Sequence, residues 1–510
     1  MKGKAFAAAG FCTALVVGCM SYDEFRDARF ENAARHFDKS RETEFDGARL
    51  MTLEECVSYA VKNNVDLRVL DLEEKVAKEA KTAEVLGMLP ELNASDNLTW
   101  RDNTPASASQ QVNGLQGPGT YTYSQSQDKD VNYVNVDLAL SVLDFGLAYF
   151  NSAQAQDREF IRRQRAIRAT QNLTLETVKL YFQVAASQRA VEQTKGMLDS
   201  CTNRYELIDS MAKSGRISPF RAFDETRRFT EMERRLSNFT RAYDSARSQL
   251  RSLMGLYPNT EIRVDDGILD RVPEFSLPAI DLMEQIALAK RPDLMEIDMQ
   301  RHINVNECRK TILMMCPNVR IFYDFTDSNN SFLYNRSWSE IGLRAAYNLL
   351  KLPQQIARYQ SYATQVEAED ERAYAQAIAV MAQVRMACAD LASSKERFAI
   401  DERINASYTN NLAKAEGAKK VSGELSNLEL AHMRMATAET TIERSISLGN
   451  YYIAYFRLLN TLAMDDLEQE SVNAVVKDLE AGRTRVEAET ESEREAAPAE
   501  SGSAETESEK

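Results

Sequence analysis

Two stretches of the chain carry the same pattern and predict how it is organised. Residues 53–92 read LEECVSYAVKNNVDLRVLDLEEKVAKEAKTAEVLGMLPEL, and residues 280–319 read IDLMEQIALAKRPDLMEIDMQRHINVNECRKTILMMCPNV. Asp66 and Pro90 of the first stretch fall on Asp293 and Pro317 of the second, both at an offset of 227 residues. Because the helical pattern between these points also matches, we expect two copies of one structural unit, over residues 51–276 and 277–465.

Each copy continues into segments with the period of a β-strand. Apolar residues Val134, Val136, Leu138 and Leu140 alternate with mostly polar neighbours, which is typical of a strand between lipid and a watery lumen. A half-buried hairpin of a soluble protein shows the same alternation. Two hairpins lie at equivalent positions in the two copies, which favours the interpretation of these segments as membrane strands. We expect strands over about 91–101 and 131–143, and over about 318–327 and 338–349.

Long helices follow each hairpin. The chain of 510 residues has only 19 Gly and 11 Pro, and few breakers favour long helices. Helical hairpins are predicted over 146–254 and 354–464, and helices of this length must pack as coiled coils or bundles. Their turns align at an offset of 208, with the following residues: Ser214, Gly215 and Arg216 in the first copy, and Ser422, Gly423 and Glu424 in the second.

The two ends differ from the body of the chain. Lys2 and Lys4 precede a short apolar run that ends in Val16-Val17-Gly18-Cys19. This order predicts a signal peptide over 1–18 and resembles the bacterial lipoprotein box, in which the cysteine carries lipid such as palmitate. An ordinary signal peptide with an incidental cysteine is the alternative. Residues 19–50 are expected to form an irregular lead from the anchor, and 466–510 an acidic disordered tail.

Composition excludes several classes of function. The net charge of −15 argues against nucleic acid as a partner, because phosphate binding needs a basic surface. No hydrolase, zinc-protease or phosphate-loop motif occurs, and His36, His302 and His432 lack metal-ligand spacing. We therefore expect no enzyme activity, no cofactor and no metal. The remaining cysteines are read mostly as small core residues, with a Cys308–Cys316 disulfide left open.

The quoted segments together resemble the outer-membrane efflux protein family, the TolC-like channels. The resemblance rests on TLEECVSYAVKNNVDLR, GMLPEL and LDFG in the first copy, and on ALAKRPDL, CPNV and WSEIGLRAAYNLLKLP in the second. It implies a mainly α fold with a β-barrel part, closed as a homotrimer with twelve strands and an α-helical tunnel. It also implies an exit duct in the outer membrane of a Gram-negative bacterium, working with a periplasmic adaptor and an inner-membrane transporter.

The resemblance extends to individual residues near the helical turns. Relatives carry an acid shortly after the second turn, and Glu429 matches that position, with His432 one helical turn further on. Three carboxylates around an axis would narrow the pore and favour cations, whereas a solvated helix face is the ordinary role of a glutamate. The turn residues, among them Arg216 and Glu424, are expected to contact the adaptor; contact with a neighbouring protomer and simple exposure to water are the alternatives for these two. A lipid-anchored periplasmic scaffold without a pore remains the rival function.

Overall fold

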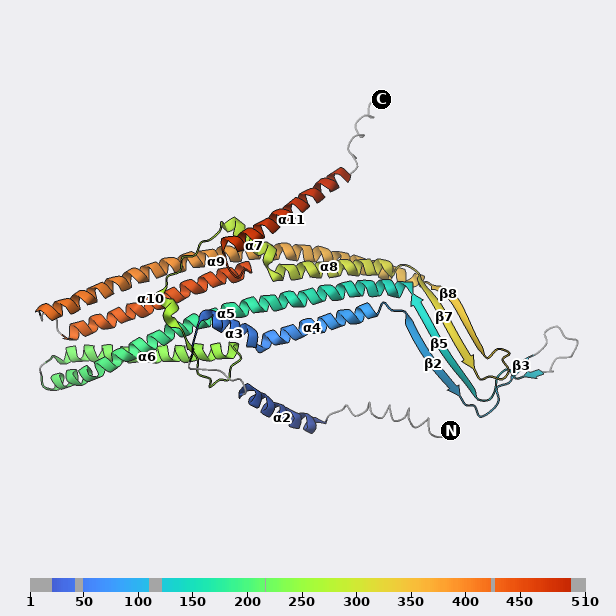
Figure 1. The fold of residues 1–510 in the computed structure, drawn as a ribbon, viewed down its shortest axis with the longest axis horizontal. Coiled ribbons are helices and arrows are strands. Elements are labelled where there is room, and N and C mark those ends of the chain that lie inside the picture. Colours follow the sequence, from blue (N-terminus) through green and yellow to red (C-terminus); the bar gives the residue numbers. More distant parts are fainter. Residues whose placement is uncertain (1–20, 42–48, 110–121, 216, 423–426, 497–510) are drawn as a thin grey trace, which may run out of the picture. The chain divides into compact units, whose positions relative to one another are not determined.

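The computed structural model describes residues 21–41, 49–109, 122–215, 217–422 and 427–496. These residues are mostly helical and include one four-stranded sheet (Figure 1), which confirms the expected mainly α fold with a β part. The helices are α2 (Tyr22–Arg41), α3 (Leu53–Asn63), α4 (Val65–Leu86), α5 (Val142–Lys213), α6 (Pro219–Leu253), α7 (Ile280–Lys290), α8 (Pro292–Leu313), α9 (Leu352–Ser422), α10 (Asn427–Leu462) and α11 (Gln469–Ala496). Two short 3₁₀ helices are η1 (Asp266–Asp270) and η2 (Leu349–Lys351).

The chain divides into two compact units. The first unit comprises Met1–Val65, Thr170–Leu277 and Met386–Asn460, and the second comprises Asp66–Ala169, Pro278–Arg385 and Thr461–Lys510. Helices α5 and α9, of 72 and 71 residues, pass from the second unit into the first. No helix within the described residues is both long and apolar enough to cross a membrane.

The sheet of the second unit joins strands from both halves of the sequence. Its strands are β2 (Glu91–Thr99), β5 (Val131–Ser141), β7 (Asn318–Ser328) and β8 (Ser337–Ala346), in the order β2-β5-β7-β8 and antiparallel throughout. The expected strands fall within a few residues of these bounds. Strands β3 (Ser107–Ser109) and β4 (Thr122–Ser124) form a separate small pair.

The helices that precede the sheet have matching bounds in the two halves. Helices α3 and α4 contain 11 and 22 residues, as do α7 and α8, and each begins 227 residues before its counterpart, the offset read from the sequence. Thr52 and Glu55 form a capping box at the start of α3. The break after α3 is held by Asn64, whose side-chain amide donates to the Leu253 carbonyl oxygen at 3.0 Å.

The corresponding break after α7 is held by a buried arginine. Arg291 is 4% exposed and donates from Nε and Nη2 to the carboxylate of Asp293, at 2.9 and 2.7 Å. Gln376 of α9 donates to the same carboxylate at 2.8 Å. Burial by itself would raise the pKa of Asp293, but these donors outweigh it and hold the pKa below its ordinary value. The Arg-Pro-Asp segment is therefore a structural clamp between α8 and α9.

The core of the first unit lies where α3, α5 and α6 meet a short parallel strand pair. Strand β1 (Leu50–Met51) pairs with β6 (Arg263–Val264), and the sequence pattern did not predict this pair. Buried Tyr181 donates its hydroxyl to the Asp265 carbonyl oxygen at 2.6 Å. Phe182 stacks on Tyr452 with ring centroids 4.8 Å apart. These contacts tie the strand pair and α10 to the long helix α5.

Two terminal segments differ from the expectation. Residues expected to form an irregular lead include the 20-residue helix α2, and the tail expected to be disordered includes the 28-residue helix α11. Helix α11 forms because its apolar residues share one stripe that packs within the second unit: Val472 and Val475 are buried, and Arg483 donates to Gln285 of α7 at 2.9 Å. A helix with such a stripe gains enough burial to order its backbone.

Candidate functional site

One face of the four-stranded sheet is apolar. Residues directly opposite in the strand register share a face, and one such row across all four strands is Leu92, Leu138, Tyr323 and Ile341. The apolar face comprises this row together with Leu98, Val134, Val136, Leu140, Ile321, Phe325 and Leu343. Leu92 is 68% exposed and Ile341 78%. Within the part of the chain that the structure describes, much of this face is therefore left exposed, although burying such side chains is favourable.

The other face of the sheet is polar and charged. Its central row is Asn93, Asp137, Asp324 and Glu340, and Arg320 donates to the Asp137 carboxylate at 3.1 Å. We call this the polar face, and it also carries Ser95, Asn135, Thr326 and Arg344. The two faces thus meet the requirement of a strand that separates lipid from water.

An aromatic side chain interrupts the polar face. Phe322 lies opposite Gly342, and a Cβ on that glycine would come within 2.4 Å of the Phe322 ring. The guanidinium of Arg344 lies over the same ring, 5.5 Å from its centroid. Glycine is needed at position 342 because the ring occupies the space of a side chain.

The segments that connect the strands at one end of the sheet are tied to each other. Asn330 is 1% exposed; its amide donates to the Ser126 carbonyl oxygen, and its carbonyl accepts from the Asp128 backbone, both at 3.1 Å. The Asp128 carboxylate accepts from the Ser331 hydroxyl at 2.8 Å. These hydrogen bonds join the connection before β5 to the connection after β7, so the two halves of the sheet share a fixed rim.

The first helical turn has the backbone that its sequence predicts. Gly215 adopts a φ of +70°, a left-handed conformation that a side chain would disfavour. The hydroxyl of Ser218 then caps α6 by accepting from the Arg221 backbone, and Pro219 occupies the first turn. Of the expected contact residues, Ser214 and Gly215 are described. Arg216, Gly423 and Glu424 lie outside the described residues, as do the side chain of Ser422 and the expected lipid site Cys19.

The two expected constriction residues have different surroundings. Glu429 lies in the first turn of α10 and is exposed. His432 is half-buried, and its Nε2 is 2.7 Å from the carboxylate of Glu225 on α6. No pattern in the sequence pointed to Glu225, because the two partners are 207 positions apart. The structure therefore assigns His432 to a contact between α10 and α6 and leaves the role of Glu429 as a prediction.

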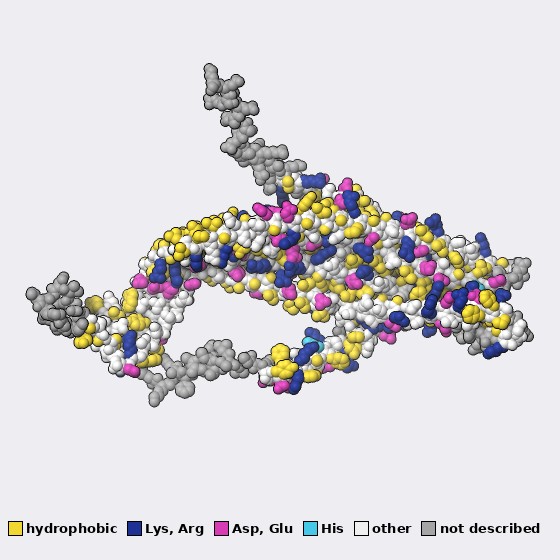
Figure 2. Space-filling view, turned by 180° about the vertical axis from the view of Figure 1, so that it is seen from behind, with side chains coloured by type: hydrophobic (Ala, Val, Ile, Leu, Met, Phe, Trp, Pro, Cys, Tyr) yellow, Lys and Arg dark blue, Asp and Glu magenta, His cyan; other side chains and the backbone are white. Residues whose placement is uncertain are grey.

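The described residues hold neither a metal-binding cluster nor a disulfide between Cys308 and Cys316. No group of three or more His, Cys, Asp or Glu able to hold a metal occurs among the residues that the structure describes. Cys308 and Cys316 are not joined by a disulfide. On the face drawn in Figure 2, basic and acidic side chains are interspersed over the helices.

Comparison with known proteins agrees with this geometry. Residues 56–256 match the sequence model of the family described as outer membrane efflux protein, and no curated protein matches the chain. The CmeC outer membrane channel of Campylobacter jejuni shares the fold at 12% identity and a TM-score of 0.65, over 84% of this chain and 89% of that one.

Two further solved structures are similar at comparable levels. CusC has 15% identity and a TM-score of 0.63, with 82% of this chain and 95% of that chain covered. The MtrE outer membrane channel of Neisseria gonorrhoeae has 14% identity and a TM-score of 0.61, with 82% and 91% covered. The resemblance inferred from the sequence is thus confirmed: residues 56–256 match the sequence model of the outer membrane efflux protein family, and the fold is similar over most of the chain to outer-membrane channels.

Proposed function

We propose that this protein is the outer-membrane exit duct of a tripartite efflux or type I secretion system. In this role it passively conducts substrates from an inner-membrane transporter and a periplasmic adaptor to the exterior. The observation that carries the proposal is the exposed apolar face of the sheet, backed by a polar face and bounded by two open edges.

The open edges require copies of the same chain. Strands β2 and β8 each pair on one side only within the four-stranded sheet. An unpaired backbone edge in lipid costs several kcal/mol for each unsatisfied group, so a membrane sheet must close into a barrel. Joining β8 of one copy to β2 of the next satisfies both edges with a single kind of interface, which closes around a symmetry axis. Three copies of the four-stranded sheet make the twelve-stranded barrel that the family resemblance implies.

The helices supply the rest of the duct. At about 1.5 Å per residue, α5 and α9 are each roughly 105 Å long, long enough for the tunnel of a periplasmic channel. Their turns, at Ser214–Arg216 and Ser422–Glu424, are the proposed contact with the adaptor. Lipid on Cys19 would add a second attachment to the outer membrane, because acyl chains partition into the bilayer.

The first experiment measures assembly and conductance together. The lipidated protein, extracted in detergent, is expected to have the mass of a trimer and to give discrete current steps in a planar bilayer. A monomer that leaves the membrane once its lipid is removed, and that gives no current steps, would favour the pore-free periplasmic scaffold instead.

A second experiment tests the proposed constriction. If three Glu429 carboxylates ring the pore, Glu429→Ala should enlarge the current steps and reduce their preference for cations, because a ring of like charges selects for the opposite sign. Glu396→Ala, which removes an exposed glutamate of α9, is the matched control. Equal currents in all three proteins would keep the channel and remove Glu429 from its gate.

A further inference from the structure

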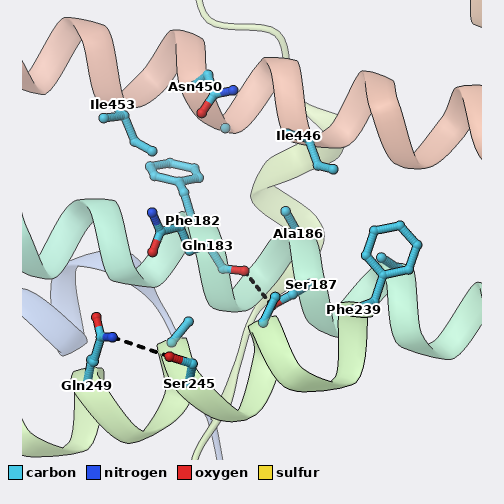
Figure 3. Close-up of a pocket in the computed structure, with 14 residues that line it drawn as sticks. Phe182, Gln183, Ala186, Ser187, Phe239, Ser245, Gln249, Ile446, Asn450 and Ile453 are labelled. Carbon is cyan, nitrogen blue, oxygen red and sulfur yellow. Dashed lines mark hydrogen bonds between the residues drawn. The ribbon is translucent and has the colours of Figure 1, made fainter. Parts of the chain in front are cut away.

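Two adjoining pockets lie between α5, α6 and α10 in the first unit. The first has a volume of about 410 Å³ and the second about 440 Å³, both within the range of small-molecule sites. Phe239 of α6 and Ile446 of α10 line both pockets, so the two spaces are neighbours that share these two side chains. Figure 3 shows Phe239 and Ile446 at one end of the first pocket, away from Ile453.

The first pocket is apolar and uncharged. Phe182, Ile446 and Ile453 line it together with small side chains such as Ala186, and only serines and the amides of Gln and Asn provide polar atoms (Figure 3). Gly449 lines the space from α10, and a Cβ at that position would come within 3.5 Å of Phe182. An apolar body without hydrogen-bonding groups fits this lining, since it would bring no polar group of its own into the pocket without a partner.

The second pocket is lined by methionines and by charged side chains. Met197, Met232 and Met435 come from three different helices and line it together. Thioether side chains are polarisable and adapt to irregular ligands, and the ring of Phe239 offers a face that attracts cations. The lining therefore suits a polarisable group that carries positive charge.

Most of the charges in the second pocket are already paired. Arg235 pairs with Glu439, His432 with Glu225, and Arg228 with Asp224. The remaining lining acids are Glu231, which pairs with Arg227 at 2.9 Å, and Glu443. Glu443 alone among them forms no ion pair within the part of the chain that the structure describes.

Both carboxylates and guanidiniums lie near Glu443. Partial burial, and then the nearby carboxylates of Glu439 and Asp401, raise the pKa of Glu443 above its ordinary value, although Arg235 and Arg397 act in the opposite direction. A cation placed beside this carboxylate would relieve the repulsion. Glu443 is also exposed, so a ligand can reach it from solvent.

We propose that these pockets form one binding site for an amphipathic organic cation. Its apolar body occupies the pocket beside Phe182 and Gly449, and its cationic group lies among the three methionines, against Phe239 and Glu443. The site is in the helical wall, and it does not depend on whether the sheet closes into a channel.

The test uses tetraphenylphosphonium, a cation with an aromatic body, titrated into the full-length protein in detergent and followed by calorimetry. Triphenylphosphine oxide is the neutral comparison. We expect saturable binding of the cation, weakened about three- to tenfold by Glu443→Gln, as expected for loss of one partly screened charge. The neutral compound should bind equally to wild type and Glu443→Gln.

Two further variants separate the apolar body from the charge. Gly449→Leu fills the apolar pocket and should weaken both compounds, whereas Glu396→Gln on α9 should change neither. Glu443→Gln keeps the shape of an exposed side chain, and its helicity and melting temperature are checked by circular dichroism. The proposal is overturned if the cation does not saturate wild type, or if Glu443→Gln binds it as tightly as wild type does.

Discussion

Placing a charge on the apolar face of the sheet tests the membrane assignment most directly. Ile341 lies in the middle of β8, opposite Tyr323 and in the row that crosses all four strands. It is 78% exposed, so Ile341→Arg disturbs little packing within the chain. If this face contacts lipid near the bilayer centre, the arginine should cost about 2–4 kcal/mol per protomer in folding free energy.

The neighbouring position provides a matched control. Glu340→Arg introduces the same side chain one residue earlier, where it lies on the polar face opposite Asp324. There the arginine meets a carboxylate in water, and we expect a change within about 1 kcal/mol.

The assay is urea unfolding of protein refolded into lipid vesicles, with heat-resistant trimers counted on gels. A clearly lower urea midpoint and fewer trimers are expected for Ile341→Arg only. Equal midpoints for the two variants would refute the assignment of the apolar face to lipid, and a lower midpoint for Glu340→Arg would reverse the two faces.

Three further predictions concern the helical part. Gly255→Ala should destabilise the protein by at least about 1 kcal/mol, because its φ is +66° and a Cβ would meet a backbone oxygen at 2.9 Å; Gly417→Ala, with open space around it, should be neutral or stabilising in the same thermal melts. Asp293→Asn should lower the melting temperature at pH 7, and the difference from wild type should shrink below about pH 4. The reason is that the pKa of the Asp293 carboxyl is lowered in the folded protein, so the stability it contributes is lost as the pH falls through that pKa. A difference that persists at pH 2 would contradict this. Burial raises the pKa of Cys56 to about 12. A maleimide at pH 7.5 should therefore label the exposed Cys316 within minutes and Cys56 only in denaturant, as measured by mass spectrometry of peptides. Rapid labelling of Cys56 in the folded protein would contradict its burial in the core.

The sequence by itself determined the periodic features. Alternation at Val134 to Leu140 placed an apolar and a polar face on one strand, because side chains of a strand point to opposite sides in turn. The offset between Asp66 and Asp293 predicted matching helices in the two halves. The structure has helices of equal length at these positions, since the same helix breaks recur at the same spacing. Both are local rules that depend on a few neighbouring residues.

Two features of the fold were not predicted from the sequence: helix α11 and the strand pair β1–β6. Helix α11 was missed because its residues are mostly acidic or small, and its order depends on burying Val472 and Val475 within the second unit. The strand pair β1–β6 was missed because each strand has two residues, too few for a period to show.

Only the tertiary structure decided which distant side chains meet. His432 faces Glu225, and Asp293 is held by Arg291 and by Gln376 of another helix. The pocket beside Glu443 is lined by three helices, so its lining residues can be identified only from their packing. Periodicity fixes which face of an element is apolar. The partners of each polar side chain depend on how the helices are packed in register, and no local pattern in the chain encodes that.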